Sequence, residues 1–77
     1  MTQEVRSYFA ACHALDASAG ATGTKLARGG IADMDALCAL LEEYPDKLLA
    51  IRNIGPKSMA VIRGICEVYR SERGDAL

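Results

Sequence analysis

The stretch that decides the fold is LLAIRNIGPKSMAVI, residues 48–62. Apolar residues lie on both sides of a tight turn at Asn53-Ile54-Gly55, and Pro56 follows the turn at once. Proline suits the first position of a helix, because its ring presets φ and the N–H that it lacks has no partner there. The stretch therefore predicts a short apolar helix, a turn, and a second helix that begins at Pro56.

Capping residues and prolines place the neighbouring helices. Asp33 is a good N-cap for a helix over 34–43, and this helix is expected to end at Tyr44, since a residue before proline is pushed out of the helical region. Pro45 then opens a short helix over 45–51, whose inward side chains are expected to be Leu48, Leu49 and Ile51. The last helix is expected over 56–71. Its predicted buried stripe consists of Met59, Ile62, Ile65, Cys66 and Tyr69, with Arg63, Glu67 and Arg70 facing water.

The first third of the chain carries a weaker pattern. An N-terminal amphipathic helix is expected over 1–15, with the helical pattern itself over 3–15. Its predicted apolar stripe consists of Val5, Tyr8, Phe9, Cys12 and Leu15. Residues 16–23 are small and include two glycines, each of which costs ~1 kcal/mol in a helix interior. They are interpreted as a linker or a poorly formed helix start. A short helix over 24–28 is then stopped by Gly29-Gly30, with one glycine in the left-handed conformation.

No segment alternates with a period of two over the length of a strand, so the chain is predicted to be all-α, a compact bundle of four to five short helices. One main domain is expected over 24–73, after the linker (16–23), with a frayed tail over 74–77. Leu-Ala-x3-Ile occurs at residues 26–31 and again at 49–54, an offset of 23. This match is either a pseudo-repeat or chance.

Charge is segregated along a chain whose formal net charge is only -1. Residues 29–46 contain five acids and no base, and residues 47–66 contain four bases and no acid. The whole-chain charge does not favour strong nucleic-acid binding, whereas the basic segment that contains the turn does. The acidic and basic segments could also pair head to tail between copies of the chain, which keeps self-association open.

The few reactive residues do not suggest catalysis. The three cysteines form no C-x-x-C pair and are expected to be buried free thiols in a reducing cytoplasm. The single histidine, His13, lies off the apolar stripe, and no metal cluster or cofactor site is expected. No apolar run reaches the ~20 residues that cross a bilayer, and the N-terminus lacks the apolar region of a signal peptide. A non-enzymatic cytoplasmic protein with no membrane partner is predicted.

The turn at 53–55 suits a phosphate group. The first N–H groups of a helix have no internal partner, and the helix end carries a partial positive charge. Gly55 lets an oxygen approach the backbone, and Lys57 and Ser58 add a cation and a hydroxyl donor. Arg52 and Asn53 could reach the same or a neighbouring phosphate. A solvated helix start that binds nothing is the alternative interpretation of the same residues.

The pieces LARGGI (26–31), Met34-x2-Leu37 with Leu40-Leu41, and DKLLAIRNIGPKS (46–58) resemble the C-terminal domain of the bacterial RNA polymerase alpha subunit, a helix-hairpin-helix domain. The resemblance covers residues 24–73. It implies contact with the DNA backbone across the minor groove and docking to transcription factors or RNA polymerase. The family's glycine, lysine and serine fall on Gly55, Lys57 and Ser58. Its first-helix arginine and asparagine fall near Ala21 and Thr24, and Lys25 is the nearest base.

Two functions from different classes follow. The first is a small non-catalytic DNA-binding module, with weak and backbone-directed binding because the family's arginine is missing. Its expected contacts are Arg52, Asn53, Gly55, Lys57, Ser58 and Lys25. The second is a protein-interaction or self-association module without direct DNA binding, since the same helical architecture also serves proteins that bind proteins.

Overall fold

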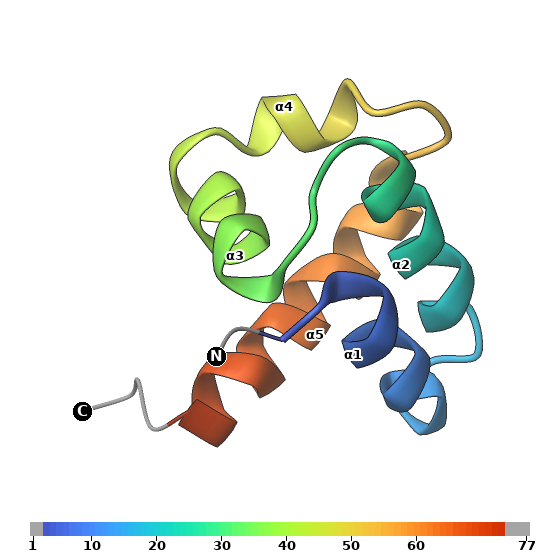
Figure 1. Cartoon of the computed structure of the whole chain (residues 1–77). Helices are drawn as coiled ribbons and strands as arrows, with labels where there is room; N and C mark the ends of the chain where they lie inside the picture. The colour runs from blue at the N-terminus through green and yellow to red at the C-terminus, as the bar shows by residue number, and fades with distance from the viewer. Residues whose placement is uncertain (1–2, 74–77) are drawn as a thin grey trace.

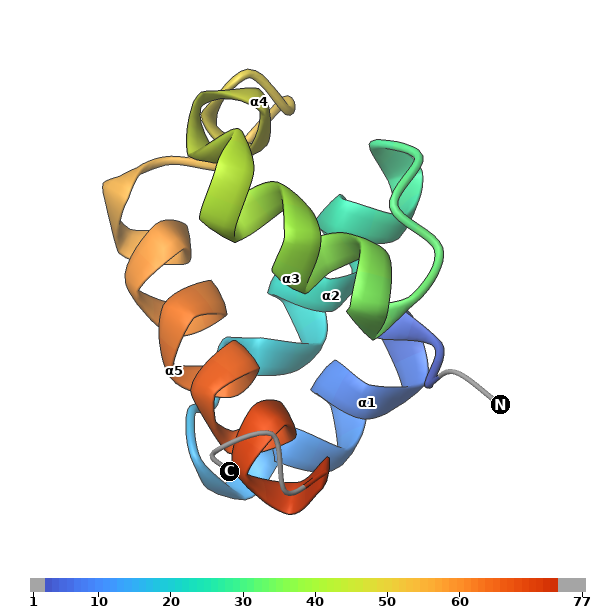
Figure 2. The same ribbon diagram turned by 90° about the vertical axis from the view of Figure 1, so that its left-hand side faces the viewer.

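The computed structural model describes residues 3–73, which form a small all-α bundle (Figures 1 and 2). Its long helix α5 lies against both α2 and α3, α1 packs on α2, and α4 follows α3 at one end of the bundle. Within residues 3–73 there is no strand, only an isolated bridge between Glu4 and Asp33. The elements in chain order are α1 (Val5–Ala11), the 3-10 helix η1 (Cys12–Ala14), α2 (Ala19–Arg28), α3 (Met34–Glu43), α4 (Pro45–Leu49) and α5 (Pro56–Arg73).

One hydrophobic core joins all the helices. Its largest fully buried side chains include Phe9 of α1, Leu26 of α2, Leu37 of α3, Leu48 of α4 and Ile62 of α5. The predicted stripe of the last helix is confirmed, since all five of its members are buried. Because α1 and α2 contribute to the same core as the rest, residues before 24 are part of the bundle.

The prediction of a linker over 16–23 is wrong from Ala19 onward, where α2 begins. A Cβ on Gly23 would lie 2.5 Å from Cβ of Phe9, so α1 and α2 approach closely only because that residue is glycine. Two glycines in α2 cost about 2 kcal/mol together. Burial of Phe9 alone stabilises by about 1.5–3 kcal/mol, and buried Val5 and Ala19 add to it. Tertiary packing therefore outweighs the local propensity.

Three helices also end at residues other than those predicted. The first regular helix stops at Ala11, and a 3-10 turn follows in which the Leu15 N–H donates to the Cys12 carbonyl. Leu15 leaves the apolar stripe and is 62% exposed. The helix expected over 45–51 ends at Leu49, which is 45% exposed rather than inward. The last helix continues two residues beyond the predicted end.

The capping predictions are confirmed. The Ala36 N–H donates to Oδ1 of Asp33 at 2.8 Å, which fixes the start of α3. Gly30 has a φ of 98°, the left-handed conformation expected after α2.

Arg70, expected to face water, is instead half-buried. It forms an ion pair with Glu42 (N–O 2.6 Å) and donates to the Cys38 carbonyl at 3.4 Å.

The predicted frayed tail over 74–77 lies outside the described residues. Among the described residues, no helix is long and apolar enough to cross a membrane.

Candidate nucleic-acid interface

Two helix-hairpin-helix elements make up the candidate interface: α2–turn–α3 and α4–turn–α5. The turns share their geometry at an offset of 23 residues, because Gly30 (φ 98°) and Asn53 (φ 68°) are both left-handed. Each is followed by a buried isoleucine, Ile31 or Ile54. The pseudo-repeat therefore holds at the turns. The equivalence does not extend to the leucines of the two segments, since Leu26 is fully buried and Leu49 is exposed.

The ends of the two hairpins touch. A Cβ on Gly29 would lie 2.8 Å from Cγ2 of Ile51, so this glycine lets the end of α2 pack against the residues after α4. Ile51 is half-buried against the core. The contact brings basic side chains of both segments to one place, although they are more than twenty residues apart in the chain.

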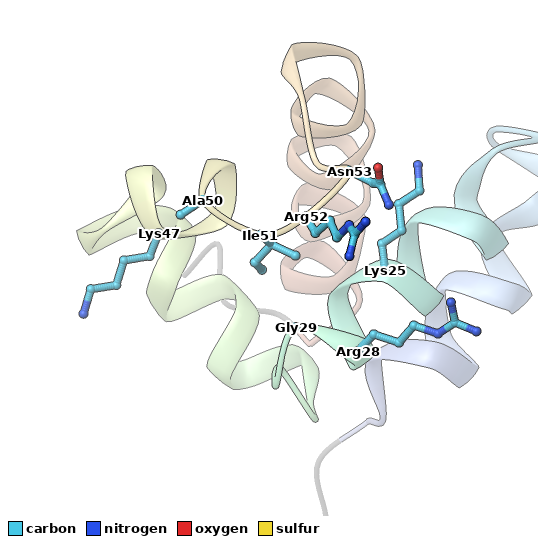
Figure 3. A pocket seen from close by; sticks show the side chains of 8 residues that line it. All are labelled: Lys25, Arg28, Gly29, Lys47, Ala50, Ile51, Arg52 and Asn53. Carbon is cyan, nitrogen blue, oxygen red and sulfur yellow. The ribbon is translucent and has the colours of Figure 1, made fainter.

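A hollow of about 610 Å³ lies between these ends (Figure 3), and we call it the α2–α4 hollow. Its lining contains four bases and no acid. Lys25, Arg52 and Asn53 lie near one another in Figure 3, whereas Lys47 extends away from them. The Lys47 Nζ instead lies 4.8 Å from the centroid of the Tyr44 ring, a cation–π contact. The full lining consists of Lys25, Arg28, Gly29, Lys47, Ala50, Ile51, Arg52 and Asn53.

A second hollow, which we call the α5 hollow, lies at the start of α5. It is lined by Lys57 and Ser58, by Lys25 from α2, and by Asp16 and Ser18 from the segment before α2. The Met59 N–H donates to the Gly55 carbonyl at 2.9 Å. Gly55 is thus the N-cap of α5, and the earlier N–H groups of the helix have no intrahelical acceptor.

Asp16 changes the electrostatics of the α5 hollow. Its carboxylate accepts hydrogen bonds from the Ser18 N–H (2.8 Å) and hydroxyl (2.6 Å), and these bonds hold the pKa of Asp16 below its usual value. The positive charge of Lys57 lowers that pKa further. Lys57 therefore shares the α5 hollow with a carboxylate, which competes with any phosphate at this position.

The structure brings together most of the residues that the sequence predicts. Arg52 and Asn53 share the α2–α4 hollow, Lys57 and Ser58 share the α5 hollow, and Lys25 lines both. Gly55 lines neither.

Sequence reasoning missed Arg28 as a lining residue of the α2–α4 hollow and Asp16 as a neighbour of Lys57. The pseudo-repeat could have indicated Arg28, because this base directly precedes the first of the two equivalent turns. No feature of the sequence pointed to Asp16, whose approach to α5 depends on the path of the chain before α2.

The three thiols lie in the core. All three cysteines are free and buried, and burial raises the pKa of Cys12 and of Cys66, the latter also through neighbouring Cys38. Within the part of the chain that the structure describes, no group of three His, Cys, Asp or Glu side chains could hold a metal ion.

No protein-family model, curated protein or solved structure matches the chain.

Proposed function

We propose that this protein is a small non-catalytic DNA-binding module that contacts the phosphate backbone through its helix-hairpin-helix turn. The observation that carries the proposal is the position of Lys25, which lies beside Arg52 and Asn53 in one hollow and beside Lys57 and Ser58 in the next. Cations and hydrogen-bond donors from α2, from the turn and from α5 thus gather on one face. Such groups bind phosphates without reading the base sequence.

The expected affinity is modest. With two or three phosphates engaged, a Kd of ~10⁻⁴–10⁻⁶ M is expected at physiological salt, and it should weaken as salt rises. Fluorescence anisotropy with a short labelled duplex at low salt measures it directly. Lys25→Glu should weaken binding about tenfold or more, because a cation that serves both hollows becomes an anion. Arg63→Glu is the matched control, since Arg63 is exposed and lines neither hollow. Equal affinity of the two variants would contradict the proposal.

The proposal includes a role in transcription, in the cytoplasm, with RNA polymerase or transcription factors as protein partners. Its support is the resemblance of residues 24–73 to the polymerase alpha C-terminal domain, together with thiols that remain free, as in a reducing compartment. Gel filtration with purified RNA polymerase tests this part. Co-elution that survives nuclease treatment is expected, and separate elution would count against a polymerase partner.

Exposed apolar residues favour a second candidate function, protein interaction or self-association without direct DNA binding. Tyr44 is 55% exposed and Leu49 is 45% exposed, and both lie at the ends of α4. If this surface joins two copies, light scattering should show a concentration-dependent mass that the double variant Tyr44→Ser with Leu49→Ser abolishes. Leu15→Ser, at an exposed leucine outside α4, is the control. A strict monomer at all concentrations and salts would rule self-association out.

A further inference from the structure

We infer that the α2–α4 hollow is the primary phosphate-binding site of this protein, and that its ligand is the phosphodiester backbone of nucleic acid. The bases that hold the backbone there are Lys25, Arg28 and Arg52. The start of α5, where Lys57 and Ser58 lie, is a secondary site. This inference rests on the proposed function and ranks its two hollows, with the main binding energy in the α2–α4 hollow.

Unbalanced positive charge is the first observation behind the inference. Three cations of the α2–α4 hollow, Lys25, Arg28 and Arg52, lie on one surface, and no acid lines it. Among the described residues 3–73, none of the three forms an ion pair. Like charges held together without an anion destabilise the folded chain. A bound phosphodiester would supply the missing negative charge.

The negative ends of α2 and α4 offset only part of the positive charge of these three bases. Lys25 and Arg28 lie in the last turn of α2, where a base offsets the partial negative charge of the helix terminus. The ends of α2 and α4 each carry at most about half an elementary charge. Three full positive charges exceed both ends together by about two elementary charges. Arg52 lies beyond α4 in the turn, so its charge is available to a ligand.

The start of α5 carries less net positive charge than the α2–α4 hollow. Lys57 and the helix terminus together supply about one and a half positive charges, and Asp16 removes one of them. With Lys25 counted for both hollows, about one and a half positive charges remain at the start of α5 and about two in the α2–α4 hollow. Because Lys25 lines both hollows, it cannot reverse this order.

The α2–α4 hollow is also firmly built. The contact between Gly29 and Ile51 fixes the distance between the two hairpin ends, so the backbone segments that carry the three bases are already close together before the ligand arrives. Its volume of about 610 Å³ is large enough for a phosphate with its sugar. Preorganised donors lose less entropy on binding than mobile ones.

The experiment compares Arg28→Gln, Lys57→Gln and Asp16→Asn in duplex binding by fluorescence anisotropy over a range of salt. Arg28→Gln should weaken binding about tenfold and reduce the slope of log K against log salt by about one. Lys57→Gln should weaken it by about threefold or less. Asp16→Asn should strengthen binding, since the amide oxygen can still accept from the Ser18 N–H while the negative charge is lost. Circular dichroism and thermal melting verify that each variant is folded.

The outcomes separate the inference from the proposed function. If Lys57→Gln weakens binding more than Arg28→Gln does, the protein binds DNA but the inference is wrong. If the wild-type chain binds no duplex at low salt, the proposed function and the nucleic-acid ligand assigned here are both wrong, and amide NMR shifts during titration with pyrophosphate then decide whether the hollow binds phosphate at all. Shifts at Gly29 and at residues 51–53 would support the α2–α4 hollow as a phosphate site. Shifts at 57–58 alone, or none, would overturn it.

Discussion

Gly23 has no side chain, and α1 occupies the space where one would be. A Cβ there would lie 2.5 Å from Cβ of Phe9 and 3.4 Å from the Val5 carbonyl oxygen. Gly23→Ala should therefore force α1 away from α2 and destabilise the fold by about 1–3 kcal/mol. Gly64→Ala is the matched control in α5. No atom outside the adjacent residues and backbone of its own helix lies within 4 Å of the added Cβ, and the change should stabilise by about 0.5–1 kcal/mol. Urea denaturation measures both.

Asn53 carries the backbone strain of the second hairpin, with a φ of 68°. Asparagine tolerates this conformation better than other residues with side chains, and glycine adopts it freely. Asn53→Val should lower the free energy of unfolding by about 1–3 kcal/mol, because a β-branched residue is strained there. Asn53→Gly should leave stability within about 1 kcal/mol of the wild type. Equal thermal melting of the two variants would contradict this role.

Asn53→Gly also separates structure from binding. It keeps the turn and removes the amide side chain from the α2–α4 hollow. A loss of DNA affinity in this variant would thus report a direct contact by Asn53.

At the scale of the elements, α3 depends on its N-cap. The Asp33 carboxylate accepts the Ala36 N–H at 2.8 Å, and Asp35 in the first turn also suits the helix dipole. Asp33→Ala should cost about 0.5–2 kcal/mol, and Asp33→Ser should recover most of it, because serine can also cap. Thermal melting of the two variants tests this order. A Ser variant as unstable as the Ala variant would show that capping is not the cause.

Capping and turn chemistry are local, which explains why α3 and the starts of α4 and α5 could be predicted from sequence. Asp33, Pro45 and Pro56 act on residues within a few positions of themselves. The start of α2 could not be predicted in this way. Its stability comes from Phe9 and Val5 of α1, which are ten or more residues away.

At the scale of the whole molecule, the three thiols report on the opening of the core. Cys12, Cys38 and Cys66 are at most 7% exposed, and burial raises the pKa of Cys12 and Cys66, so little thiolate forms in the native protein. Labelling with a disulfide reagent at mildly alkaline pH should be slow in the native chain and fast in denaturant. Gly23→Ala should accelerate the native reaction, since it lowers the free energy of opening. Fast labelling of native wild-type protein would contradict a single closed core.

The candidate site was only partly predictable. Arg52, Asn53, Lys57 and Ser58 belong to one local motif, so their proximity follows from the turn itself. That Arg28 reaches the same hollow depends on the contact between Gly29 and Ile51. That Lys57 and Asp16 line one hollow depends on where the chain before α2 runs.

The sequence by itself determined the helical class, the caps and the second hairpin, because periodicity, proline and N-cap chemistry act over a few residues. The tertiary structure alone decided that residues 19–23 are helical, that Leu15 and Leu49 are exposed, and which bases share a surface. These outcomes depend on packing between segments distant in the chain. Close approach of α1 to α2, and of one hairpin end to the other, required the absence of a side chain at two glycines, Gly23 and Gly29. Helix propensity alone treats such glycines only as destabilising, because it takes no account of the packing that they allow.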